Sequence, residues 1–243
     1  MSSHDIEKMI RRTANLVGVD IHRHRPEATQ LGRLSSMLSH HGVDLVFDVG
    51  ANSGQFASAL RTSGYGGRIV SFEPLSSAHA DLVRHSRDDP DWDPAPRTAI
   101  GDRAGELVIN VSANSVSSSA LGMLDSHSSA APESAYRYDE TAPVTTLDAI
   151  AEHYLRPGST PFLKIDTQGY EDRVLDGATA LLSRSRGLQL ELSFVPLYAE
   201  QKLFGELSAR LLALGFSIWA IWPGLCDPAS GRMLQVDVTF FRD

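Results

Sequence analysis

The sequence predicts an α/β domain built on a largely parallel sheet with helices on both faces. From about residue 45 onward, short β-rich runs alternate with runs of helical periodicity, and this alternation favours parallel strand pairing. The last two strand-like runs, Phe216–Ile221 and Leu234–Phe241, are joined only by a turn-rich loop. No crossover helix fits between them, so these two strands should pair antiparallel.

The first 42 residues predict a helical extension ahead of this domain. Ile6, Met9 and Ile10 fall on one helical face. Leu34 and Leu38 belong to a second face with the same spacing. Five of the nine histidines also lie in this extension, namely His4, His22, His24, His40 and His41. A metal cluster is one interpretation of them, and a polar loop at residues 22–25 is the simpler one.

Residues 43–243 are expected to form one domain, a common size for a single α/β unit. Short apolar runs between turn residues predict strands at Leu45–Val49, Gly67–Phe72, Arg97–Ile100, Leu107–Val111, Phe162–Ile165 and Gly187–Leu192. Helical spacing of apolar residues predicts helices at Gln55–Thr62, Ser76–Arg87, Thr146–Tyr154, Glu171–Ser183 and Glu200–Leu214. Ser76 should cap its helix, and Gly215 should end the last one.

Residues 114–141 interrupt this alternation, because they are rich in Ser, Ala, Pro and Gly. A flexible linker is one interpretation. The segment lies inside the domain, however, and long internal loops of compact domains are often lids or binding loops. We therefore favour a substrate-side loop.

Composition and charge narrow the class of protein. Hydrophobic residues make up 42% and charged residues 21%, which is typical of a globular protein. The net charge of -8 argues against a nucleic-acid binder, because such proteins need basic surfaces for phosphates. Cys226 is the only cysteine, so an internal disulfide and a cysteine-based metal site are excluded. With no apolar run of membrane-spanning length, we expect a cytoplasmic protein, and peripheral membrane contact stays open.

The most informative stretch runs from Val46 to Gly54, where an apolar strand leads through Asp48, Gly50 and Asn52 into a helix. Ligands of open α/β sheets bind outside the carboxyl ends of the strands. Gly50 lets the backbone turn sharply and approach a ligand. The amide groups at the start of the next helix favour a carboxylate or a phosphate.

Two ligand classes compete for this turn. A dinucleotide site wants Gly-x-Gly-x-x-Gly, but the middle glycine is replaced by Asn52. Asp48 would also place negative charge near the phosphates. For a ligand with a methionine moiety, the same carboxylate can pair with the ammonium group.

The second and third strands end in further polar candidates. Glu73 lies about twenty residues past the glycine turn, where an acidic residue binds ribose hydroxyls. Pro74 then fixes the direction of the chain. Asp102, after the third strand, could accept a hydrogen bond from an adenine amino group.

With these motifs in place, the sequence resembles the FkbM-type methyltransferases, a family of S-adenosylmethionine-dependent O-methyltransferases. The resemblance covers residue 45 to the C-terminus. It is carried mainly by the stretches 46–56, 71–74, 99–102, 162–171, 174–178 and 191–194. The resemblance implies a Rossmann-like class I methyltransferase fold, with a seven-stranded sheet whose last strand is antiparallel.

The resemblance also implies an S-adenosylmethionine site. The expected cofactor-binding residues are Asp48, Gly50, Asn52, Ser53, Gly54, Gln55, Phe56, Glu73, Pro74, Gly101, Asp102 and Asp166. One position departs from the family pattern, which often has glutamate where this chain has Gln168. A role that needs negative charge at that position is therefore not expected here.

Methyl transfer to an alcohol needs a group that accepts the hydroxyl proton. Asp166 ends a central strand beside the expected cofactor and is the first candidate for this catalytic base. Glu191, at the end of the next strand, is the second, and His127 in the Ser-rich segment is the third and more typical of a surface position. Metal assistance through Asp166 and Glu191 is an alternative, although no metal is expected.

The acceptor is expected to be a small molecule or a glycolipid, with a sugar hydroxyl as the favoured target. Tyr136, Tyr138, Trp219 and Trp222 could offer aromatic faces to a sugar, or could simply pack. An NAD-dependent oxidoreductase and a non-catalytic cofactor-binding scaffold remain as alternative functions.

Overall fold

The computed structural model describes residues 3–19, 21 and 29–242. The polar stretch at residues 22–25, with His22 and His24, lies outside the described residues, as does the side chain of His4. The predicted choice between a metal cluster and a polar loop therefore stays untested there.

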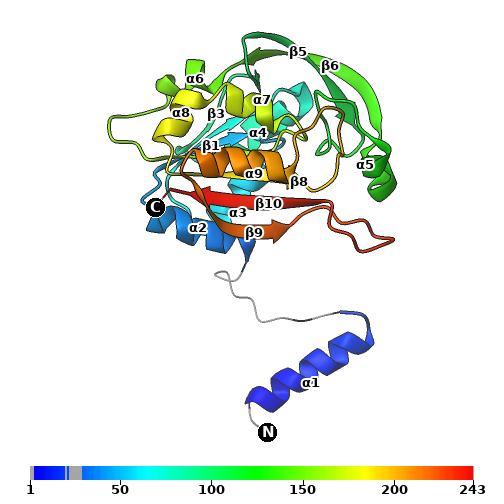
Figure 1. Cartoon of the computed structure of the whole chain (residues 1–243). Helices are drawn as coiled ribbons and strands as arrows, with labels where there is room; N and C mark the ends of the chain where they lie inside the picture. Colours follow the sequence, from blue (N-terminus) through cyan, green and yellow to red (C-terminus); the bar gives the residue numbers. More distant parts are fainter. Residues whose placement is uncertain (1–2, 20, 22–28, 243) are drawn as a thin grey trace.

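The domain is built on a seven-stranded sheet in the order β3-β2-β1-β7-β8-β10-β9 (Figure 1). Its strands are β1 (Leu45–Val49), β2 (Arg68–Phe72), β3 (Trp92–Pro94), β7 (Pro161–Ile165), β8 (Gly187–Ser193), β9 (Ser217–Pro223) and β10 (Gln235–Phe241). Neighbouring strands from β3 to β8 pair parallel, and β10 pairs antiparallel with both β8 and β9. The predicted Rossmann-like α/β fold with an antiparallel last strand is confirmed.

Helices cover both faces of this sheet because its central strands are apolar on both sides. All five residues of β1 are buried: Val46 packs in one core cluster, whereas Leu45 and Phe47 pack in the other. The first cluster includes side chains of α2 (Gln30–His40), α3 (Gln55–Thr62) and α4 (Ser76–Ser86). The second includes side chains of α6 (Leu147–Ile150), α7 (Glu171–Asp176), α8 (Thr179–Arg184) and α9 (Phe204–Ala213).

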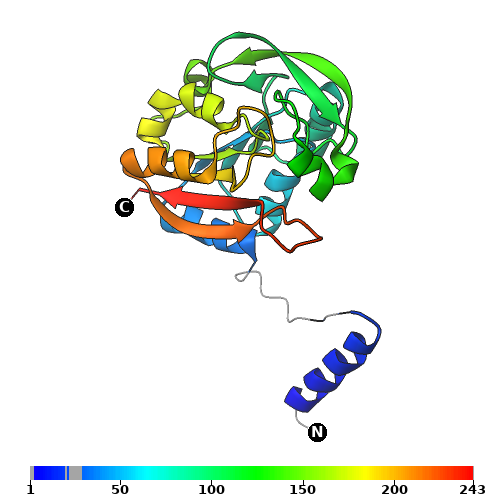
Figure 2. The same ribbon diagram turned by 45° about the vertical axis from the view of Figure 1, so that its right-hand side comes forward.

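A second sheet of three strands stands beside the first. It has the order β4-β6-β5, from β4 (Ala99–Ile100), β5 (Gly105–Ser112) and β6 (Tyr136–Thr145). The long antiparallel strands β5 and β6 run together as a ribbon (Figure 2). Between them lie a turn segment, α5 (Asp125–Ala130) and the 3₁₀ turn Pro132–Ser134.

The β6 strand changes the interpretation of residues 114–141. Residues 136–141, which the sequence assigns to a loop, pair antiparallel with β5, with a register shift between Val111 and Ser112. Their polar side chains hide the strand pattern, because one face of the ribbon is exposed. Only residues 113–135 connect the two strands.

The predicted helix Glu171–Ser183 is in fact two helices, α7 and α8. Asp148 causes the break: its carboxylate accepts hydrogen bonds from the backbone N–H groups of Ala180 and Leu181, so it caps α8 from another element. Gly177, between the two helices, approaches the carbonyl oxygen of Gly101 so closely that a Cβ atom would lie 2.0 Å from it. These contacts come from residues distant in the sequence.

Other helix boundaries also shift for local reasons. Ser76 does not cap α4 with its side chain; its N–H instead donates to Glu140 Oε1 at 2.8 Å. The last helix begins at Phe204 rather than at Glu200, whose φ of +59° is not helical. The predicted helix Thr146–Tyr154 is a short α6 followed by the 3₁₀ turn Ala151–His153.

The N-terminal extension contains α1 (Ser3–Leu16) and α2, as predicted. Leu34 and Leu38 of α2 are buried against the sheet. On α1, Ile6, Met9 and Ile10 are 43%, 54% and 48% exposed. Among the described residues, none of the helices has the length and apolar character that crossing a bilayer requires.

The central strand β8 provides a test of this packing. Leu190 is fully buried in the core cluster, and Leu212 on α9 is half exposed. We expect Leu190→Ala to lower the free energy of unfolding by about 3 kcal/mol, because it leaves a cavity in the core. The matched Leu212→Ala should change it by less than about 0.5 kcal/mol. Urea unfolding followed by circular dichroism measures both, and equal losses would contradict this packing.

Candidate active site

A cavity of about 290 Å³ opens at the carboxyl ends of β1, β2 and β7. Its walls come from the turns after these three strands, from β4 and β5, and from residues 115–120. Its volume is at the lower end of the range of small-molecule sites, about 300–1,000 Å³. The position is the one predicted for the ligand.

The turn after β1 needs its two glycines. Gly50 has φ +79°, and a Cβ atom there would lie 1.9 Å from the carbonyl oxygen of Asp166. Gly54 has φ +87°, and a Cβ atom would lie 2.6 Å from the ring of Trp92. The glycines therefore let β1 and β7 approach and let α3 begin against β3. Gly50 lines the cavity, whereas Gly54 is a packing residue.

Asn52 organises the wall above this turn. Its φ of +48° is left-handed, a conformation that asparagine tolerates better than most residues. Its backbone N–H donates to Glu73 Oε2 at 2.8 Å, and its side chain donates to Ser115 Oγ at 3.3 Å. Asn52, Gln55 and Phe56 line the cavity as predicted, and Ser53 does not.

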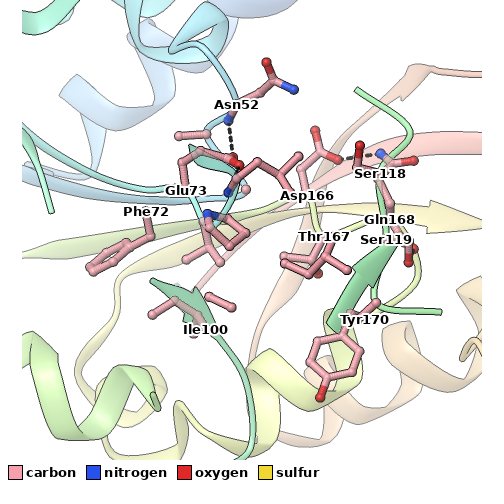
Figure 3. Close-up of a pocket in the computed structure, with 18 of the residues that line it drawn as sticks. Asn52, Phe72, Glu73, Ile100, Ser118, Ser119, Asp166, Thr167, Gln168 and Tyr170 are labelled. Atoms are coloured by element: carbon pink, nitrogen blue, oxygen red, sulfur yellow. Dashed lines mark hydrogen bonds between the residues drawn. The ribbon is translucent and has the colours of Figure 1, made fainter. Parts of the chain in front are cut away.

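Glu73 is buried at the cavity wall, directly after β2 (Figure 3). Its two carboxylate oxygens accept from the N–H groups of Asn52 and Leu75, each at 2.8 Å. Burial raises the pKa of Glu73 to about 7. Carboxylate oxygens retain lone pairs after such bonds, so Glu73 can still accept from a ribose diol. Pro74 follows it in the lining.

Asp48 does not reach the cavity, in contrast to the prediction. It is fully buried, accepts from Ser71 Oγ at 3.2 Å, and lies 3.4 Å from the ammonium group of Lys164. Lys164 lines the cavity and also lies 3.2 Å from Asp166. The sequence predicts that Asp48 pairs with the ammonium group of the ligand, but it pairs with the ammonium group of Lys164 instead. Burial raises the pKa of Asp48, although Lys164 opposes the shift.

Gly101 and Asp102 also lie outside the lining. Asp102 pairs with Arg173 at 3.6 Å and with Arg103 at 3.9 Å, so its carboxylate is not aimed at an adenine. The cavity instead has an apolar wall made by Phe72, Ile100, Leu107 and Ile109. Figure 3 shows Phe72 and Ile100 on one side and Asp166, Thr167 and Gln168 on the other.

Asp166 is the acidic group that faces the cavity from β7. Its side chain is 32% exposed, and its backbone N–H donates to Val49 O at 3.0 Å. Burial alone would raise the pKa of Asp166. The charge of Lys164 and the hydrogen bond from Gln168 overcome this effect and hold the pKa below its ordinary value. Asp166 is therefore ionised at neutral pH, as a proton acceptor must be.

Glu191 lies behind Asp166 rather than in the lining. Burial and the negative charges of Asp166, Asp237 and Glu171 raise the pKa of Glu191 well above its ordinary value. Asp237 lies opposite Glu191 in the register of β8 and β10. The two predicted catalytic carboxyl groups are therefore brought together, but with opposite protonation preferences.

Part of the segment predicted to lie on the substrate side, residues 115, 116 and 118–120, lines the cavity. Ser115 accepts from the Asn52 side chain, and Ser119 Oγ donates to the carbonyl oxygen of Gln168 at 2.7 Å. The segment is thus tied to the turns after both β1 and β7. Its hydroxyl groups at Ser115, Ser118 and Ser119 line the cavity.

Several other sequence candidates lie elsewhere. His127 is buried on α5, where its ring packs against Tyr198 at 5.1 Å, so it is neither a surface residue nor part of the lining. The Tyr136 hydroxyl donates to Leu121 O. The aromatic side chains Tyr136, Tyr138, Trp219 and Trp222 do not line the cavity. They provide no sugar platform there.

Sequence reasoning misses Lys164 and Tyr198 as site residues. A lysine inside the buried run Phe162–Ile165 is the available signal, because a buried ammonium needs carboxylate partners. Tyr198 donates to Gln168 Oε1 at 2.7 Å, and nothing in the local sequence shows this contact. Within residues 3–19, 21 and 29–242, no group of three or more His, Cys, Asp or Glu side chains is arranged to hold a metal ion.

Comparison with known proteins agrees with this geometry. Residues 48–218 match a family model described as the methyltransferase FkbM domain. No curated protein matches the sequence.

Two solved structures are similar in fold. Magnesium protoporphyrin IX methyltransferase from Synechocystis PCC 6803, solved with bound SAM, is 13% identical, with a TM-score of 0.47 and coverage of 97% of this chain and 96% of that chain. A TehB-like SAM-dependent methyltransferase from Corynebacterium glutamicum is 11% identical, with a TM-score of 0.42 and coverage of 98% and 97%.

Glu73 gives the cavity a testable pH dependence. Because its pKa is about 7, its ionised fraction grows as the pH rises through neutrality, and an ionised carboxylate accepts stronger hydrogen bonds. We expect the affinity for S-adenosylmethionine to increase up to about tenfold, ~1.4 kcal/mol, across this range. Glu73→Gln should weaken binding and remove the pH dependence in calorimetric titrations. Asp102→Asn is the control, and an equal loss there would contradict the assigned lining.

Proposed function

This chain belongs to the FkbM methyltransferase family, and we propose that it transfers a methyl group from S-adenosylmethionine to a hydroxyl group of a sugar. The sugar would be part of a glycolipid or of another secondary metabolite. One observation carries the proposal: Asp166 lines the cavity 3.2 Å from the ammonium group of Lys164, whose charge lowers the pKa of Asp166, whereas burial raises the pKa of the neighbouring Glu191. Such an arrangement suits the removal of a proton from an alcohol.

The residues of the cavity fit S-adenosylmethionine, which is the cofactor of this family. Glu73 can accept from the ribose hydroxyls, and the apolar wall at Phe72 and Ile100 suits the adenine ring. Gly50 lines the cavity and carries no side chain, so a ligand can approach the backbone directly there. The start of α3, at Gln55, offers N–H groups to the carboxylate of the methionine moiety.

When bound, S-adenosylmethionine supplies an electrophilic methyl group on a sulfonium. The acceptor oxygen forms its bond to the methyl carbon as the bond from that carbon to sulfur breaks, and S-adenosylhomocysteine leaves. Asp166 takes the hydroxyl proton. The segment at residues 115–120, which lines the cavity, would help to hold the acceptor beside the methyl group. Lys164 keeps Asp166 ionised until the proton arrives.

The neutral polar groups of the lining support a sugar as the acceptor. Asn52, Gln55 and the hydroxyl groups of residues 115–119 can exchange hydrogen bonds with a polyhydroxylated ring. A sugar is therefore better matched than an acidic or a strongly apolar acceptor. Glycolipid and secondary-metabolite acceptors, a cytoplasmic location, peripheral membrane contact and the absence of nucleic-acid partners stay predictions from the sequence.

Labelled S-adenosylmethionine tests the proposed reaction directly. Incubation of the protein with the labelled cofactor and a glycolipid extract should give label in the sugar fraction, because hydroxyl transfer attaches the methyl group there. A matched extract with acetylated hydroxyl groups should receive none. Label that appears equally in both extracts would contradict a hydroxyl acceptor. Cofactor binding without any transfer would instead favour the scaffold alternative, and tighter binding of NADH would favour the oxidoreductase.

Asp166→Asn tests the assigned base. The amide keeps the shape of the side chain but cannot take a proton, so we expect turnover to fall about a hundredfold or more. The dissociation constant of S-adenosylmethionine should stay within about threefold. Asp172→Asn, outside the cavity, controls for a general loss of negative charge. Equal losses of turnover and of cofactor affinity in Asp166→Asn would remove it as the base.

A further inference from the structure

We propose that Gln168 is the positioning residue of the reaction centre: its amide, whose oxygen accepts from the hydroxyl of Tyr198, binds Asp166 and Glu191 together and leaves Asp166 as the carboxylate that receives the proton. This inference rests on the proposed role of Asp166 as the base. It assigns functions to two residues outside the acid–base pair itself.

The amide nitrogen of Gln168 serves both acids at once. Nε2 donates to Asp166 Oδ1 at 2.8 Å and to Glu191 Oε2 at 2.5 Å. An amide nitrogen has two N–H bonds, so one is available for each carboxyl group. Gln168 therefore bridges the ends of β7 and β8 and fixes the spacing of the pair.

Tyr198 binds the other end of the amide, whose nitrogen faces the two carboxyl groups. Its hydroxyl donates to Gln168 Oε1 at 2.7 Å, which leaves the nitrogen to face the acids. The reversed amide would place its oxygen against two carboxyl groups and its nitrogen against the hydroxyl. Tyr198 itself is fully buried, with its ring against Gly169 and His127, so the hydroxyl has a fixed place.

Hydrogen bonds also hold the backbone at Gln168 in a conformation that directs the amide toward the two acids. Its φ of +53° is left-handed, which is unfavourable for a residue with a side chain. Ser119 Oγ binds its carbonyl oxygen, and Glu171 Oε1 accepts from the N–H groups of Thr167 and Gly169 at 3.0 and 3.1 Å. Contacts from two other segments thus maintain a conformation that aims the amide inward.

The surrounding charges shift the pKa values of the two acids in opposite directions. Lys164 is ion-paired with Asp166 and with Asp48 of β1. Asp237 of β10 and Glu171 of α7 act on Glu191 from the other sides. Burial and these negative charges raise the pKa of Glu191, while Lys164 and Gln168 oppose burial and lower the pKa of Asp166. The amide of Gln168 lies between the two acids and donates a hydrogen bond to each.

Infrared spectroscopy tests the protonation pattern without any acceptor. At neutral pH, the difference between the wild-type and Glu191→Gln spectra should contain the C=O stretch of one protonated carboxyl group. In Gln168→Glu, a carboxyl group replaces the amide that donates to Glu191, so the pKa of Glu191 should rise. The band of its protonated carboxyl group should therefore persist to higher pH. Absence of the band from the wild-type spectrum at neutral pH would overturn the proposal.

The pH–rate profile tests the positioning role. Gln168→Glu removes two hydrogen bonds and adds a negative charge, so the pKa of Asp166 should rise and the acid limb should move to higher pH by about one unit or more. Tyr198→Phe keeps the ring and should move the limb in the same direction by less. Tyr65→Phe removes a buried hydroxyl outside the cavity lining and should leave the limb in place.

The two proposals fail in different ways. A rate that falls equally at every pH in Gln168→Glu and Tyr198→Phe would show a merely structural role and would overturn the inference. Failure of the wild-type protein to bind S-adenosylmethionine would overturn the proposed function, whereas the infrared band would still report on the acid pair. Urea unfolding of each variant separates both outcomes from loss of the fold.

Discussion

The ion pairs of Lys164 with Asp48 and Asp166 are the interaction on which the centre of the molecule depends. They join β1 to β7 at the sheet edge where the cavity opens. An isolated buried charge is very unfavourable, so each of these groups requires the others to remain charged. The same ammonium group binds Asp48, which is fully buried, and Asp166, which lines the cavity. Two similar carboxylates therefore differ in role: Asp48 is structural, and Asp166 is the proposed base.

Much of the fold can be predicted from local sequence patterns. The apolar run of β1 and the glycines that follow it determine a strand, a turn and a helix, and all three appear where the sequence places them. The errors arise where distant residues intervene. Asp148 divides α7 from α8 by capping the second helix. The β6 strand is hidden because exposed polar side chains on one face remove the apolar signal.

The residues of the site also differ in whether the local sequence predicts them. Glu73 and Asp166 can be predicted because they end strands at the ligand edge of a parallel sheet, where topology alone determines their place. Asp102 instead follows β4, which belongs to the three-stranded sheet, and it pairs with Arg173. Tyr198 is thirty residues from Gln168, and no spacing rule connects them. Position along a strand is thus local information, whereas the direction of a side chain depends on its partners.

The hydrogen bond from Ser119 to the carbonyl oxygen of Gln168 ties the segment at residues 115–120, which lines the cavity, to the turn after β7. A shift of the cavity wall at Ser119 would therefore also remove a support of the left-handed backbone at Gln168. The shape of the ligand site and the placement of the amide that binds Asp166 are in this way coupled through one hydroxyl group.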